Sequence, residues 1–265
     1  MTAAPRTGRP GRRNRPAHQV ATADGTVGEQ ERSALFSFEG VVVDRAGRRV
    51  LDVDHAVIAG AGPTAIVGPS GSGKSTLLRL CNGLEAPSAG VVRYLGTDLA
   101  SADPLAHRRE VAMVFQQPIA LAGTVGDNLR EADADLGDDA IVEALHRVGL
   151  SGATARRPAG ELSGGELQRL GLARSLATGP GVLLLDEVTS ALDPTNAARI
   201  ELLIGGLAAQ GIVAIWVSHD LEQVRRVARF VVVMAAGSVA QCGTVADVMA
   251  DPHPVVEGFL GGGTA

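Results

Sequence analysis

The residues with the clearest chemical potential lie in the segment IVGPSGSGKST, residues 66–76. It fits the pattern G-x-x-x-x-G-K-[ST], follows an apolar run and precedes a helical pattern. This context predicts a loop whose backbone N–H groups point at phosphate oxygens, beside a positive helix N-terminus. A glycine-rich turn alone would be weak, but the fixed Lys-Ser-Thr spacing makes the pattern specific. We therefore predict a nucleotide phosphate site formed by Gly68, Pro69, Ser70, Gly71, Ser72, Gly73, Lys74, Ser75 and Thr76.

Lys74 is the only lysine among the 24 basic residues of the chain. A compact ammonium on a flexible stem can reach between the β- and γ-phosphate oxygens, whereas a wide planar guanidinium would not fit a loop wrapped closely around them. We predict that Lys74 binds these phosphates and assists catalysis.

Two carboxylates, Asp186 and Glu187, follow the apolar run VLLL. Asp186 can hold Mg²⁺ together with the Ser75 hydroxyl, and Glu187 can polarise the water that attacks the γ-phosphate. Solvated acids at the end of a strand are the alternative. The phosphate loop upstream favours the catalytic interpretation.

A second anion-binding segment is ELSGGELQRLGLARSLA, residues 161–177, where Ser163, Gly164 and Gly165 precede an amphipathic helix. This segment resembles the signature of the ATP-binding cassette (ABC) family, LSGGQ in its commonest form. Glu166 replaces the final glutamine. Since a carboxylate facing phosphate is unfavourable, we expect Glu166 to point away from the nucleotide.

The resemblance continues in the order of the family from about residue 35 to the end. MVFQQP resembles the Q-loop with Gln116, TSALDP the D-loop with Asp193, and WVSHD the switch region with His219. The resemblance implies that Gln116 senses Mg²⁺ and the attacking water and that His219 bonds the γ-phosphate. It also implies that Asp193 lies at the nucleotide site.

The resemblance also implies the fold and the assembly. The expected fold is an α/β P-loop NTPase in residues 33–265, with a RecA-like parallel-sheet core, a small antiparallel β subdomain and a helical signature subdomain at about 117–175. Two cassettes, expected to be identical, would pair head to tail, so that Ser163 and Gly165 complete the ATP site of the opposite subunit. ATP and Mg²⁺ are the implied cofactors.

One family feature is missing. The aromatic residue on which cassettes commonly stack adenine is replaced by Arg45 in VVVDRAGRRVL. A guanidinium plane can also stack on a base. We therefore expect Arg45 to bind the base, with Phe36 and Phe38 as weaker alternatives.

The elements that must position these groups alternate along the chain. Apolar runs predict strands, and the pattern of Leu77, Leu78, Cys81 and Leu84 predicts a helix over 75–84. Strands separated by helices imply a parallel sheet with active groups at the carboxyl ends of the strands. The predicted strands are 41–44 and 56–59 in a small sheet, and 64–68, 182–187 and 212–220 in the main one.

The composition is that of a globular chain, with 265 residues, 45% hydrophobic and 20% charged. Its longest apolar stretches fall far below the roughly 20 residues that cross a bilayer. Cys81 and Cys242 have no metal-ligand or disulfide spacing, so we expect both to be buried apolar residues.

Residues 1–32 differ from the rest, because they are rich in Arg, Pro and Gly and lack apolar periodicity. They carry a charge of +3, which leaves −8 for residues 33–265 out of the net −5. We predict a disordered, solvated tail. Contact of its arginines with anionic lipid or nucleic acid is the less favoured alternative.

We thus predict an ATP-hydrolysing subunit that powers separate transmembrane permease subunits from the cytoplasmic face of the membrane. No nucleic-acid partner is expected, and a substrate-binding protein would join if the transporter is an importer. A soluble cassette without a transporter is the alternative, although such proteins usually carry tandem cassettes or a coiled coil. A P-loop kinase or GTPase would not explain the signature. The resemblance extends to cassettes for iron export or phosphate import, which makes these the expected cargoes.

Overall fold

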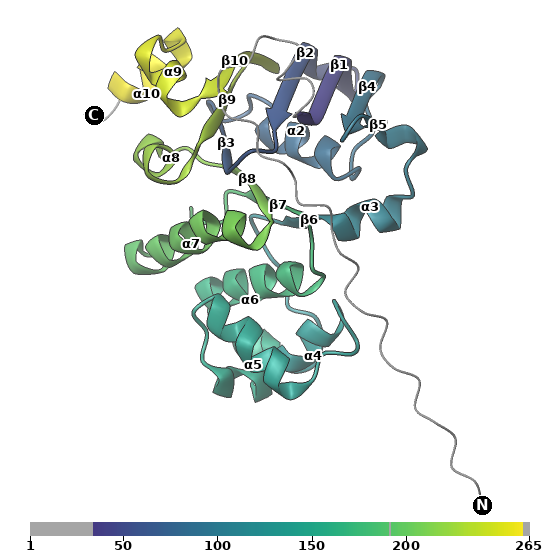
Figure 1. The fold of residues 1–265 in the computed structure, drawn as a ribbon, viewed down its shortest axis with the longest axis vertical. Helices are drawn as coiled ribbons and strands as arrows, with labels where there is room; N and C mark the ends of the chain where they lie inside the picture. Colours follow the sequence, from purple (N-terminus) through teal and green to yellow (C-terminus); the bar gives the residue numbers. More distant parts are fainter. Residues whose placement is uncertain (1–33, 191, 262–265) are drawn as a thin grey trace, which may run out of the picture.

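The computed structural model describes residues 34–190 and 192–261, and the predicted tail at 1–32 lies outside them. Within the described residues the chain forms two sheets with helices around them (Figure 1). The strands of the first sheet lie near one end of the view, beside α2. Helices α4, α5 and α6 gather at the opposite end.

The first sheet is antiparallel, with strand order β2-β1-β4-β5. Its long hairpin pairs Phe36 with Ile58 and Val43 with Leu51, and alternate residues are buried as the two-residue period of a strand requires. The predicted strands 41–44 and 56–59 are confirmed as parts of longer ones. The strands are β1 (Ala34–Arg45), β2 (Arg48–Ala59), β4 (Ala89–Tyr94) and β5 (Thr97–Asp98).

The second sheet has strand order β10-β9-β3-β8-β7-β6, with all neighbours parallel except β10. β3 and β7 are buried along their whole length, as expected for parallel strands covered on both faces. The predicted parallel sheet is confirmed. Its strands are β3 (Thr64–Val67), β6 (Val111–Val114), β7 (Val182–Asp186), β8 (Val213–Val217), β9 (Phe230–Ala235) and β10 (Ser238–Thr244).

Helices connect these strands and form the remaining part of the molecule. The α-helices are α2 (Lys74–Cys81), α3 (Pro104–Glu110), α4 (Val125–Arg130), α5 (Asp138–Arg147), α6 (Gly164–Ala177), α7 (Pro194–Leu207), α8 (Leu221–Val227), α9 (Val245–Ala250) and α10 (Pro254–Gly261). Short 3₁₀ turns lie at Leu99–Ser101, Gly152–Arg156, Ala159–Glu161 and Ala208–Gln210. None of the helices in this part of the chain is both long and apolar enough to cross a membrane.

Two sequence-based expectations are wrong. The helix predicted over 75–84 ends at Cys81, because Gly83 adopts a left-handed φ of 66° and the Asn82 side chain accepts the N–H of Leu84. Leu84 is consequently 43% exposed rather than part of the buried helix face. Cys81 is buried as expected, but Cys242 is exposed, because it lies on the edge strand β10.

Candidate nucleotide site

The phosphate loop joins the end of β3 to the start of α2. Gly68 has a φ of 148°, and a Cβ atom there would lie 2.2 Å from the carbonyl oxygen of Met234. The loop therefore turns directly against the end of β9, an approach that only glycine allows.

Lys74 lies inside this loop and is only 6% exposed. Its Nζ donates hydrogen bonds to the carbonyl oxygens of Gly68 and Pro69, both at 2.9 Å. Burial lowers the pKa of Lys74, while the charges of Glu187 and Asp186 act in the opposite direction. An anionic ligand in the loop would offset this desolvation.

Ser75 and Asp186 come together although they are 111 residues apart. The Ser75 hydroxyl donates to Oδ1 of Asp186 at 2.8 Å, and burial raises the pKa of Asp186. A hydroxyl and a carboxylate at this spacing are hard oxygen ligands, which suit Mg²⁺ when phosphate and water complete its shell. The hydroxyl of Ser72 in the same loop is buried without a hydrogen-bond partner, which fits a loop shaped for ligand oxygens.

Glu187 leaves the end of β7 in a left-handed conformation, with φ of 50°. Ser190 holds this strained turn, because its N–H and its hydroxyl both donate to the carbonyl oxygen of Glu187, at 3.1 and 2.8 Å. Gln116 donates from Nε2 to Oε2 of Glu187 at 3.0 Å. A rare backbone conformation at a candidate base is typical of functional sites.

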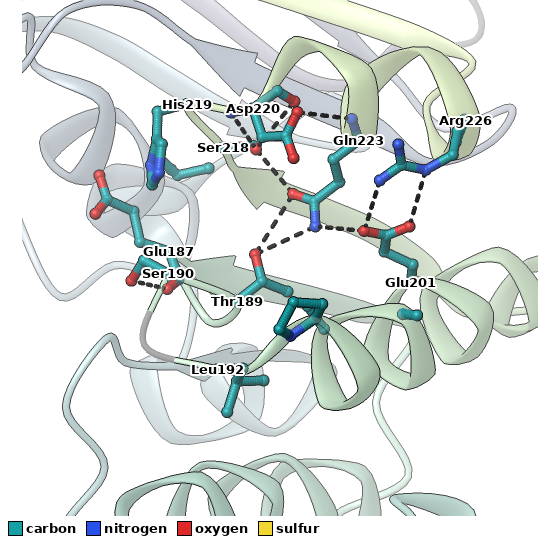
Figure 2. A pocket seen from close by; sticks show the side chains of 14 residues that line it. Glu187, Thr189, Ser190, Leu192, Glu201, Ser218, His219, Asp220, Gln223 and Arg226 are labelled. Carbon is teal, nitrogen blue, oxygen red and sulfur yellow. Dashed lines mark hydrogen bonds and ion pairs between the residues drawn. The ribbon is translucent and has the colours of Figure 1, made fainter.

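Beside Glu187 lies a cavity of about 420 Å³, between the loops that follow β7 and β8 (Figure 2). β7 and β8 are adjacent, with Asp186 opposite Val217, so the two loops begin at the same level of the sheet. Glu187 and His219 both line the cavity. The sheet thus brings the candidate base and the switch histidine to one cavity, although they are 32 residues apart in the sequence.

The signature segment begins helix α6, with Ser163 as its N-cap. Glu166 folds back on this cap: its carboxylate accepts from the backbone N–H and the hydroxyl of Ser163 and pairs with Arg157 at 2.8 Å. These bonds, with those to Ser163 largest, lower the pKa of Glu166 to about 2. The carboxylate is held by the N-cap of its own helix and by Arg157, and its orientation away from a nucleotide stays a prediction.

Asp193 caps α7 by accepting the N–H of Asn196 at 3.0 Å, and this backbone bond is the main cause that lowers the pKa of Asp193. The Asn196 side chain bonds Asp193 and also Arg169 of α6. Asp193 therefore has a structural function within the chain, and its contact with nucleotide remains a prediction.

Arg45 is held by Glu85, which accepts from Nε at 2.9 Å and from the Nη2 nitrogen. The pair forms a planar fork at the end of β1, with the Arg45 side chain 45% exposed. Phe36 and Phe38 are fully buried, so neither can present a ring face to a base. Arg45 therefore remains the preferred candidate for the residue that binds the base.

The structure thus places Asp186 against the phosphate loop through its bond with Ser75. It also places Glu187 beside Gln116, which bonds it, and His219, which lines the same cavity. Among the described residues, no hydrogen bond or ion pair joins Ser163, Gly164, Gly165 or Arg45 to the phosphate loop. Sequence reasoning missed Glu85, which binds Arg45, Arg157, which binds Glu166, and Gln223, which binds the neighbours of Glu187 and His219 in their loops. Polar residues outside any motif carry no signal of their own.

A family model described as ABC transporter matches residues 57–190, which contain both the phosphate loop and the Asp186–Glu187 pair. The chain belongs to the ABC transporter family. The cassette is 42% identical over 215 residues to Protein STAR1 of Oryza sativa subsp. japonica, covering 79% of this chain and 61% of that protein. It is 46% identical over 198 residues to the methionine import ATP-binding protein MetN of Caulobacter vibrioides, covering 71% of this chain and 59% of that protein.

A solved structure with the same fold is cbiO1 from Clostridium perfringens, described as part of the ABC transporter complex cbiONQ. The TM-score is 0.72 at 27% identity, over 86% of this chain and 96% of cbiO1. The predicted α/β P-loop fold and family are confirmed. The chain spans about 60% of the length of STAR1 and of this MetN, so the activity of the whole proteins does not transfer with the match.

Proposed function

We propose that the cassette binds ATP with Mg²⁺, pairs head to tail with a second copy and hydrolyses ATP to drive transmembrane permease subunits. The observation that carries the proposal is that Asp186, at the end of β7, bonds Ser75 of the phosphate loop beside Lys74, while the adjacent Glu187 is bonded to Gln116.

The proposed chemistry assigns each side chain one task. Lys74 exchanges its bonds to Gly68 and Pro69 for the β- and γ-phosphate oxygens, while the loop N–H groups hold the phosphates in place. Glu187 orients the attacking water and accepts its proton, and His219 bonds the γ-phosphate from the neighbouring loop.

Ser75 and Asp186 are the residues that would hold Mg²⁺. Gln116 would lie near the ion, because it bonds Glu187, the residue that follows Asp186. When bound, the cation neutralises charge on the β- and γ-phosphates. Arg45, whose guanidinium is held in place by Glu85, would stack on the base.

The second copy would supply what one chain lacks. In the part of the chain that the structure describes, Ser163 bonds Glu166 and Asp193 bonds Asn196 rather than the phosphate loop, and Ser163, Gly164, Gly165 and Asp193 would complete the site of the other subunit. The helical part at about 117–175, which includes α4 and α5, would dock on the permease at the cytoplasmic face of the membrane.

The names of these relatives do not support iron or phosphate, the cargoes expected from the sequence, since MetN is named for methionine import. We propose methionine as the first cargo to test. The test is whether it stimulates ATP hydrolysis by the cassette in complex with its own permease subunits.

Phosphate release by Glu187→Gln tests the proposed activity. We expect the parent chain to release phosphate from ATP only with Mg²⁺, and the variant to bind ATP with turnover at least about a hundredfold lower, because the proton acceptor is removed. Arg48→Gln, an exposed hairpin substitution, is the control. Hydrolysis at the parental rate by Glu187→Gln would refute the assigned base, and a parent chain that binds no ATP would refute the proposed function.

A further inference from the structure

One buried side chain outside every sequence motif joins the two loops that flank the cavity. Gln223 lies in α8 and is only 3% exposed. Its amide bonds residues from both loops and from α7, as the dashed lines in Figure 2 show.

The first bond reaches the loop that carries His219. The Ser218 hydroxyl donates to Oε1 of Gln223 at 2.8 Å and accepts the backbone N–H of Asp220 at 3.0 Å. Ser218 and Asp220 are the two neighbours of His219. Gln223 therefore fixes the backbone on both sides of the histidine.

The second bond reaches the loop that carries Glu187. Nε2 of Gln223 donates to the Thr189 hydroxyl at 3.2 Å, two residues after the candidate base. The same Nε2 donates to Oε1 of Glu201 at 3.2 Å, and Arg226 pairs with Glu201 at 3.0 Å. Both hydrogens of the amide are thus used, and its orientation is fixed.

We propose that Gln223 is a positioning residue for ATP hydrolysis, which couples the Glu187 loop to the His219 loop so that base and histidine take their reactive places together. The proposal rests on the proposed function. The bonds of the Gln223 side chain go to Thr189, Ser218 and Glu201 rather than to Glu187 or His219. It acts through Thr189 and Ser218, and misplacement of a catalytic group by a fraction of an ångström slows chemistry more than it weakens binding.

A buried glutamine with satisfied bonds can also be merely structural, and kinetics separates the two cases. For Gln223→Leu, a substitution of similar size that removes all three bonds, we expect kcat to fall about tenfold while KM for ATP changes less than about twofold. In the described part of the chain the side chains of Lys74 and Ser75 bond Gly68, Pro69 and Asp186 rather than Gln223, Thr189 or Ser218, so nucleotide binding should persist. Glu222→Gln, exposed on the same helix, is the matched control.

Thr189, which accepts the hydrogen bond from Gln223, provides a second test that leaves α8 intact. Thr189→Val removes the hydroxyl at nearly constant volume and should lower kcat like Gln223→Leu, whereas Thr189→Ser keeps the hydroxyl and should retain most of the turnover. The double variant Thr189→Val with Gln223→Leu should be no slower than the slower single variant, because both remove the same bridge.

Three results would overturn the coupling. The first is a parental kcat in both Gln223→Leu and Thr189→Val. The second is an equal loss of kcat in Thr189→Ser and Thr189→Val. The third is a double variant whose loss of kcat is the product of the two single losses. Fluorescence of Trp216, the single tryptophan and buried in β8, reports whether each variant is folded. A variant with lowered melting temperature but unchanged kcat below it would show a structural role only. If the parent itself does not hydrolyse ATP, the proposed function fails, which is a separate outcome.

Discussion

At the scale of single residues, the shape of a charged group decides its effect. Lys74 fits within the curl of the loop, with Nζ 2.9 Å from two carbonyl oxygens. Burial lowers its pKa, so desolvation disfavours the ammonium, and phosphate oxygens in the loop would offset this effect. Arginine elsewhere in the chain pairs with carboxylates as a planar fork, as Arg45 does with Glu85.

Lys74→Arg should therefore lower ATP turnover about tenfold or more although the charge is conserved, because the guanidinium is too wide for the loop. Phosphate release measures this effect, and Arg48→Lys on the exposed hairpin is the reverse exchange that should leave turnover unchanged. Parental turnover in Lys74→Arg would contradict the steric argument.

Glu166 provides a residue-scale prediction for stability. Since bonds to Ser163 and Arg157 lower its pKa to about 2, its stabilising effect is complete above the ordinary value of 4.5 and is lost as the pH falls toward 2. Because the side chain is partly exposed, we expect Glu166→Ala to lower the free energy of unfolding by only about 1 kcal/mol at pH 7.

The difference between parent and Glu166→Ala should shrink between pH 5 and pH 3, as measured by urea unfolding. Glu143→Ala, on the exposed side of α5, is the control and should show no such dependence. A difference that stays constant down to pH 3 would show that the capping carboxylate is not responsible.

At the scale of elements, the site depends on how closely β3 and its following turn approach β9. Gly68 and Gly71 both have positive φ, but only at Gly68 would a Cβ meet backbone, at 2.2 Å from the Met234 carbonyl oxygen. Nothing lies within 4 Å of the corresponding position at Gly71. The two glycines share a positive φ, 148° at Gly68 and 77° at Gly71, but differ in surroundings.

Gly68→Ala should accordingly lower the free energy of unfolding by more than about 2 kcal/mol, since it combines backbone strain with a steric clash. Gly71→Ala should lower it by about 1 kcal/mol, from strain alone. Thermal or urea unfolding of the two variants checks the ranking, and equal losses would contradict the close approach of the loop to β9.

At the scale of the whole molecule, the described chain holds separate parts of one reaction site. The phosphate loop and Glu187 lie at the parallel sheet, whereas Ser163 begins α6 and is bonded to Glu166. A head-to-tail pair would bring the two parts together.

With ATP and Mg²⁺, the mass of Glu187→Gln measured by analytical ultracentrifugation should therefore be about twice the 27.1 kDa of the single chain. The reason is that ATP binds at the shared interface and is not consumed. The same variant without ATP, and the combination of Glu187→Gln with Lys74→Ala, should remain single chains. Dimer formed equally in all three samples would indicate association independent of the nucleotide.

The sequence by itself determined the phosphate loop, the two carboxylates, the parallel sheet and the family, because these depend on short segments whose residue types and spacing carry the mechanism. It overestimated the helix after the loop and the burial of Cys242, since a turn at Gly83 and an edge position depend on surroundings. Only the tertiary structure decided that Ser75 meets Asp186, that Glu85 holds Arg45, and that Gln223 bridges Thr189 and Ser218. These contacts join segments far apart in the chain. The order of strands in the sheet, rather than any local sequence pattern, determines which of these segments lie next to each other.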